Sequence, residues 1–259
     1  MDDRGRHSVL WHVQDLTITE TAAAVARGFG GGFGLEYVAF LRHITTRIRF
    51  EDLDRRPLEV PNGDIHHRNE TLVRPGDPWL MAVAGRRVGA WSAALRGGIT
   101  IPLGKTEENP FDLGRRGLPH QHIQFGTGTW DPLAGASLGR RFGEVMTSAS
   151  VLARLPVSEN RHGYRAGRRL QLTTNADRRI RGPWRAQAGL DYARETAETW
   201  NGRIEEEGNL GRSDLLLSAG IARHFGTRAL ILTAKVPLRT RSNGVQIDYP
   251  AIVALGWAQ

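Results

Sequence analysis

Residues 184–195 read WRAQAGLDYARE, a stretch in which apolar and polar side chains alternate. The even-numbered positions carry Trp, Ala, Ala, Leu and Tyr before Arg194, and the odd-numbered positions are mostly polar. Because successive side chains of a strand point to opposite faces, this pattern predicts a β-strand with one apolar face. The stretch also matches the roughly 9–11 residues that a tilted strand needs to cross a bilayer.

The same alternation recurs along the chain, whereas the spacing of amphipathic helices is nearly absent. The other clear segments are residues 91–103 and 247–257, and weaker ones are residues 14–27, 35–50, 131–141, 144–156, 164–177, 213–224 and 228–239. The sequence therefore predicts an all-β protein, with residues 1–259 forming a single domain.

The links between these segments alternate in length. Short turns with Gly and Arg are expected at residues 28–34, 85–87, 140–144, 181–183 and 224–227, and longer polar links at residues 51–78, 104–130, 157–163, 196–212 and 240–246. Short turns at one rim and long loops at the other are typical of outer-membrane barrels. Pro102, Pro156 and Pro237 are each expected to end a strand at the loop rim, because proline cannot donate to a ladder.

These patterns predict an antiparallel transmembrane β-barrel of about 12 strands. The visible segments number about eleven, and bacterial barrels usually have an even number. A further strand is expected before residue 14, partly in residues 7–13 or upstream of Met1, or else within residues 108–128. Met1 to Arg6 lead into no apolar stretch, so an export signal is also expected upstream; otherwise the barrel prediction fails.

Composition excludes several classes of protein. The 259 residues include 35 Lys and Arg against 27 Asp and Glu, a net charge of +8, and no Cys. Without Cys there is no disulfide scaffold, thiolate metal site or Cys nucleophile, and no apolar stretch is long enough for a membrane helix. The basic residues are spread in pairs along the chain, which argues against specific nucleic-acid binding.

Two sets of residues are expected to face the lumen and the membrane interfaces. The predicted lumen-lining residues are Arg96, Arg154, Arg165, Arg169, Arg185, Gln187, Asp191 and Glu195. Their excess of arginine favours anionic solutes, because charged rings tune the field of a pore. Aromatic residues near segment ends are the predicted interface residues, and these are Trp79, Tyr164, Trp184 and Trp257.

The sequence offers candidate residues for a metal site and for a Ser–His hydrolase site. His120 and His122 alternate on an extended segment and so point to one side, and with His66, His67 and Asp131 they could bind zinc or iron. Solvated polar histidines are the favoured interpretation, so no cofactor is expected. A barrel-embedded Ser–His hydrolase is the other alternative, but no spacing distinguishes Ser92, Ser148, Ser150 or Ser218. We therefore expect no enzyme.

Short glycine-based motifs carry a resemblance to a known family. Residues 74–78 (RPGDP), 99–104 (ITIPLG), 126–132 (GTGTWDP) and 163–167 (GYRAG) are similar to motifs of outer-membrane β-barrel transporters often labelled for the meta-cleavage pathway of phenol degradation. The resemblance covers residues 70–259. It implies a barrel of about a dozen strands that passes small, often aromatic or apolar, solutes, and no catalytic residues. The basic charge, the missing export signal and the ending Trp257-Ala258-Gln259 depart from the family.

We therefore expect a passive channel or transporter for small aromatic or anionic solutes in the bacterial outer membrane. Its expected partners are outer-membrane lipid, the barrel-assembly machinery and a small-molecule solute. The first alternative is a soluble all-β binding or structural protein. The second is a barrel-embedded hydrolase or metal-binding protein that uses His120 and His122.

Overall fold

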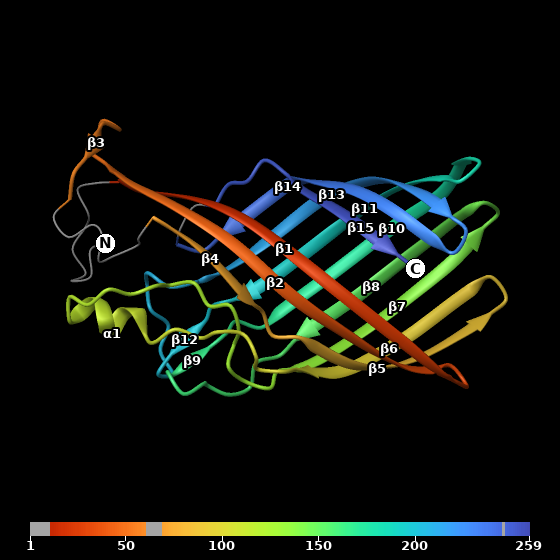
Figure 1. Cartoon of the computed structure of the whole chain (residues 1–259), viewed down its shortest axis with the longest axis horizontal. Coiled ribbons are helices and arrows are strands. Elements are labelled where there is room, and N and C mark those ends of the chain that lie inside the picture. Colours follow the sequence, from red (N-terminus) through yellow and green to blue (C-terminus); the bar gives the residue numbers. More distant parts are fainter. Residues whose placement is uncertain (1–10, 61–68, 245–246) are drawn as a thin grey trace.

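The computed structural model describes residues 11–60, 69–244 and 247–259, and it is built almost entirely of strands (Figure 1). Eleven strands follow one another in a single sheet, each hydrogen-bonded to the next. They are β1 (Trp11–Gly30), β2 (Phe33–Glu51), β5 (Trp79–Val88), β6 (Trp91–Thr100), β7 (Pro132–Phe142), β8 (Val145–Arg154), β10 (Arg169–Arg181), β11 (Trp184–Thr196), β13 (Gly211–Phe225), β14 (Arg228–Ser242) and β15 (Ile252–Ala258).

The remaining elements are short and lie in the links. β3 (Pro57–Leu58) and β4 (Glu70–Pro75) pair with β2, and β9 (Tyr164–Arg165) pairs with β12 (Thr199–Trp200) in a separate two-stranded sheet. Helix α1 (Pro110–Arg115) lies in the link between β6 and β7, where the side chain of Asn109 caps its first turn. In the described part of the chain, no helix is long and apolar enough to span a membrane.

Short turns join the strands at one end of the sheet, which we call the turn rim (Figure 1). Every pair of neighbouring strands is antiparallel. The two-residue turns begin at Gly31, Gly89, Gly143, Gly182 and Gly226, all at positive φ. Such mirror-type turns match the twist of the flanking strands.

Four of the five predicted turns are confirmed, and one is displaced. Residues 85–87 were expected to turn, but β5 continues through them to Val88 and the chain turns at Gly89 and Ala90. The strand has a regular in-and-out pattern of exposure through Gly85 and Arg86, so the glycine there does not interrupt it. All longer links lie at the opposite end, which we call the loop rim (Figure 1).

The sheet has two unlike faces. On β6 the side chains of Trp91, Leu95 and Ile99 are exposed, whereas Arg96 between them is half-buried and Thr100 is buried. We call the crowded, half-buried face the inner face and the exposed one the outer face. Because residues opposite each other in an antiparallel ladder share a face, the register carries these two faces across the whole sheet.

The eleven strands curl into a half-barrel, with β1 and β15 at its two edges (Figure 1). The predicted all-β class and antiparallel sheet are confirmed. In the described residues no ladder joins β1 to β15, so the expected closed ring of about 12 strands is an open wall of eleven. Residues 11–13 belong to β1, residues 7–10 lie outside the described part, and residues 108–128 hold α1 rather than a long strand.

Two expected strand boundaries were wrong. The alternation at residues 247–251 lies outside β15, which begins at Ile252, and β10 begins at Arg169 rather than near residue 164. Pro102 and Pro156 follow the ends of their strands as expected, but Pro237 lies inside β14. It opposes Leu216 next to a register shift, a bulge that accommodates a residue without an amide hydrogen.

Candidate channel lining and loop-rim site

Seven of the eight predicted lining residues share the inner face. Arg169 lies opposite both Arg154 and Glu195 in the ladders. Arg185, Gln187 and Asp191 lie an even number of residues before Glu195 on β11, so they share its face. Arg96 of β6 belongs to the same face. It lies opposite Gly135, which in turn lies opposite Leu152, and Leu152 is two residues from Arg154 on β8. Arg165 is the exception, because it belongs to β9 and pairs with Thr199 outside the half-barrel wall.

The charged groups of the inner face are largely matched. Arg96 Nε lies 3.2 Å from Glu36 Oε2, and Lys235 Nζ lies 3.0 Å from Asp191 Oδ1. Arg185 Nε donates to Asp177 Oδ1 over 2.6 Å. Sequence reasoning missed Glu36, Asp177 and Lys235 as lining residues, although the period-two patterns of residues 169–177 and 228–236 place Asp177 and Lys235 on the more polar face of their strands.

A local excess of positive charge lies near the loop rim. Arg154 and Arg169 face each other across the ladder between β8 and β10, and Arg169 lies 3.7 Å from the carboxylate of Glu195. Among the described residues, the buried Nε atoms of Arg154 and Arg169 have no hydrogen-bond partner. Three neighbouring side chains thus carry two positive charges and one negative charge.

A network of hydrogen bonds around Asp77 joins three of the glycine-based motifs at the loop rim. Asp77 Oδ1 accepts from Gly104 N over 2.8 Å, and Asp77 Oδ2 accepts from the amide and the hydroxyl of Thr127 over 2.6 and 3.0 Å. A Cβ added at Gly104 or Gly126 would lie within 3.0 Å of Asp77 and of the other glycine's backbone. The motifs at residues 74–78, 99–104 and 126–132 therefore meet in space, and their contacts hold the link of residues 101–131 against the start of β5.

Asp131 ends the same link inside the protein. Its side chain is fully buried, Thr129 Oγ1 donates to its Oδ1 over 2.6 Å, and its amide donates to Thr100 Oγ1 over 3.0 Å. Burial raises the pKa of Asp131 above its ordinary value, because the charged carboxylate loses contact with water. This residue fixes the start of β7.

The predicted metal ligands are only partly brought together. The rings of His120 and His122 lie 5.2 Å apart, so they share one side as expected, and Phe111 packs edge-on against His122. Asp131 is bound by Thr129 instead, and His66 and His67 lie outside the described residues. Across residues 11–60, 69–244 and 247–259, no group of three or more His, Asp or Glu could hold a metal ion.

The serines of the hydrolase alternative lie on the inner face without a histidine opposite them. Ser92 and Ser148 both face Gly139, Ser150 faces Ser137 and Thr173, and Ser218 faces Gly189 and Lys235. No pairing of nucleophile and base arises from this register. The absence of enzymatic activity and of a cofactor stays a prediction.

The predicted interface aromatics divide into two groups. Trp184 and Trp257 lie on the outer face near the turn rim, 38% and 58% exposed. Trp79 was placed wrongly, because it lies on the inner face against Phe40. Tyr164 was also placed wrongly.

Tyr164 belongs to a small core between the loops. It packs against Trp200, whose indole donates to Glu198 over 3.1 Å and whose side chain is 1% exposed. Burial raises the pKa of both Tyr164 and Glu198. The pairing of β9 with β12 draws Tyr164 inward, a contact between distant segments that no local pattern reveals.

Sequence reasoning missed several exposed aromatics at the turn rim, among them Trp91, Phe142 and Phe225. They lie on the outer face beside Arg140 and Arg223. Trp91 and Trp184 each open a strand directly after a glycine-led turn, a signal that the sequence does carry.

The fold defines the class of protein: a large antiparallel half-barrel with an apolar outer face and a charged inner face. No model of a known protein family matches the sequence, and no curated protein matches it. The resemblance to outer-membrane transporters therefore remains a prediction.

Proposed function

We propose that this chain is an outer-membrane β-barrel protein that passes small anionic or aromatic solutes passively along its inner face. The observation that carries the proposal is the contrast between the two faces of strands such as β6, β11 and β14, where apolar side chains are exposed outside and paired charges lie inside. A bilayer requires this arrangement of a spanning strand, because lipid contacts one face and polar groups the other.

The strand number supports a narrow path. Barrels of about eight strands are filled by side chains, and those of about 16 to 18 leave an aqueous channel. A wall of eleven strands lies between these cases. The lining charges are mixed, with the surplus positive charge at Arg154 and Arg169, so we expect weak selectivity for anions.

Ion conductance in planar lipid bilayers tests this proposal. We expect wild-type protein to conduct with a preference for chloride over potassium, read from the reversal potential in a salt gradient. Arg154→Gln removes a surplus positive charge, and Arg96→Gln leaves Glu36 without its cation. Both variants should shift the selectivity toward potassium by roughly twofold or more, because lining charges set the local field.

Arg178→Gln is the matched control. Arg178 is exposed on the outer face, opposite Val145 and Ala186, so its loss should leave the selectivity unchanged. Inserted protein that does not conduct, a wild-type preference for cations, or an equal effect of all three substitutions contradicts the proposal.

A further inference from the structure

A three-residue unit occurs on the outer face at the turn rim. Arg140 of β7 lies directly opposite Trp91 of β6, with its guanidinium carbon 4.7 Å from the indole centroid. The same guanidinium lies 4.5 Å from the ring centroid of Phe142, two residues further along β7. Two aromatic rings thus hold one outward-facing cation.

The unit is repeated on a second pair of strands. Arg223 of β13 lies opposite Trp184 of β11, 5.4 Å from its ring centroid, and 4.8 Å from that of Phe225. The strand sequences are RRFG at residues 140–143 and RHFG at residues 223–226, each ending in the glycine that starts a turn. The two units have the same strand register, the same residue spacing and the same stacking of Arg on Trp and Phe, so they are structurally equivalent.

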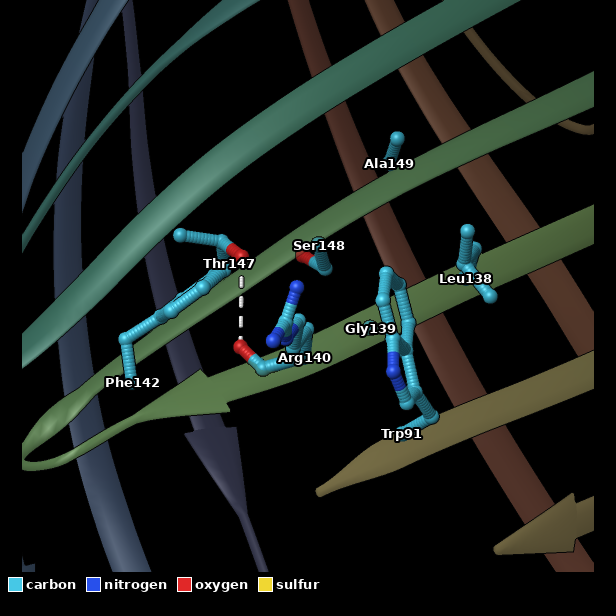
Figure 2. Close-up of a pocket in the computed structure, with 8 residues that line it drawn as sticks. All are labelled: Trp91, Leu138, Gly139, Arg140, Phe142, Thr147, Ser148 and Ala149. Atoms are coloured by element: carbon cyan, nitrogen blue, oxygen red, sulfur yellow. Dashed lines mark hydrogen bonds between the residues drawn. The ribbon is translucent and has the colours of Figure 1, made fainter. Parts of the chain in front are cut away.

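A pocket of about 260 Å³ lies at the first unit (Figure 2). Trp91, Leu138, Phe142 and Ala149 form apolar walls. Arg140 supplies the charge in the same pocket, and the Thr147 hydroxyl donates to the carbonyl oxygen of Arg140 over 3.2 Å. The pocket therefore combines a cation with a surface that suits hydrocarbon.

The charge of each unit is not neutralised by a carboxylate of the described residues. Neither Arg140 nor Arg223 forms an ion pair with a carboxylate in the part of the chain that the structure describes. A planar guanidinium can donate two parallel hydrogen bonds to a carboxylate or a phosphate. At the edge of an apolar surface, the anion found beside hydrocarbon is a lipid head group.

We propose that the two units are binding sites for anionic phospholipid, with the phosphate at Arg140 or Arg223 and an acyl chain along the apolar walls. The inference rests on the proposed function, because it places this rim at a bilayer surface. Each basic residue near a membrane surface raises the affinity for anionic lipid by about fivefold. The protein should therefore prefer phosphatidylglycerol to phosphatidylcholine at two positions.

Native mass spectrometry of the full chain in neutral detergent, with equal amounts of the two lipids added, measures this preference. We expect wild-type protein to retain up to two phosphatidylglycerol molecules. The double variant Arg140→Gln with Arg223→Gln should lose roughly fivefold in affinity at each site. Trp91→Leu with Trp184→Leu keeps the charges but removes the stacking, and should give a smaller loss.

Arg141→Gln is the matched control, because Arg141 is the next residue of the same strand and points to the inner face opposite Met146. Its phosphatidylglycerol binding should equal that of the wild type. Equal retention of both lipids by wild-type protein, or an equal loss in Arg141→Gln, overturns the inference. Arg140→Lys with Arg223→Lys keeps both charges, and its intermediate binding separates loss of the site from loss of folding.

Insertion is read separately in vesicles of pure phosphatidylcholine. Failure to insert there and in vesicles with phosphatidylglycerol refutes the proposed function itself. Insertion in both, without preferential binding of phosphatidylglycerol, refutes only the lipid sites.

Discussion

Asp131 shows how a single carboxylate can position a long loop. It has no exposed surface, its Oδ1 is held by Thr129, and its backbone amide is held by Thr100. The second oxygen, Oδ2, has no hydrogen-bond partner among the described residues. Burial without full compensation is the reason that the pKa of this group is raised.

The raised pKa of Asp131 makes loop stability depend on pH. A carboxyl group with a higher pKa in the folded state binds its proton more tightly there, so it contributes stability at low pH that is lost as the pH rises through the raised pKa. We expect the free-energy difference between wild type and Asp131→Asn to shift in favour of the wild type from pH 7 to pH 4. Thermal unfolding in detergent at each pH measures it.

Asp54→Asn, at an exposed position in the link after β2, removes the same kind of carboxylate from the surface and is the matched control. A difference between wild type and Asp131→Asn that is constant with pH contradicts the prediction.

The sequence predicted individual residues well where a strand's own alternation decides their orientation. Gln187 and Asp191 follow directly from the period-two pattern of residues 184–195. Their partners Thr233 and Lys235 come from another strand, so the contacts depend on register, which the sequence does not state. Tyr164 was misplaced for the same reason, because its contact with Trp200 joins two loops.

At the scale of one element, β13 displays both faces within neighbouring positions. Leu217 is exposed on the outer face, and the next residue, Ser218, is half-buried on the inner face opposite Gly189 and Lys235. Both lie near the middle of the strand, so they differ little in their distance from the two rims.

An arginine at these two positions should have very different effects. In the proposed outer-membrane barrel, Leu217→Arg would place a charge in hydrocarbon near the bilayer midplane, where it would cost about 2–4 kcal/mol of folding free energy. Ser218→Arg faces the polar lining, and we expect it to cost less than about 1 kcal/mol. Reversible urea unfolding in lipid vesicles gives both values, and equal costs would contradict the assigned faces.

Turns were predicted more reliably than the ends of strands. Gly143, Gly182 and Gly226 lie where the alternation of two segments stops, so local pattern and turn residue agree. At Gly85 a glycine lies inside a strand, and the sequence offered no second signal to separate it from the true turn at Gly89. The start of β10 was missed because residues 164–168 continue an extended pattern while pairing elsewhere.

For the whole molecule, the dominant feature is exposed hydrocarbon. Large apolar side chains such as Leu95 (65%), Val253 (70%) and Leu255 (73%) are exposed over the outer face, whereas most soluble proteins expose only small contiguous apolar patches. The buried hydrophobic residues are few by comparison. The outer face therefore needs a covering that the described residues do not provide.

We expect the purified protein to be monodisperse only in detergent or lipid. Dilution below the critical micelle concentration should cause aggregation within minutes to hours, because the exposed apolar face then meets water. Analytical ultracentrifugation measures this. A detergent-free, monodisperse and folded sample would favour the alternative of a soluble all-β protein.

The number of strands in the wall has a geometric consequence. With eleven antiparallel strands, β1 and β15 run in the same direction, from the loop rim to the turn rim. A direct seam between them would be parallel, and the 7 residues of β15 would match only part of the 20 residues of β1. In the proposed bilayer setting, hydrocarbon would offer no hydrogen-bond partner to the remaining backbone groups of β1. A segment that completes the wall in antiparallel pairing has to run toward the loop rim and serve two hydrogen-bonding edges of unequal length.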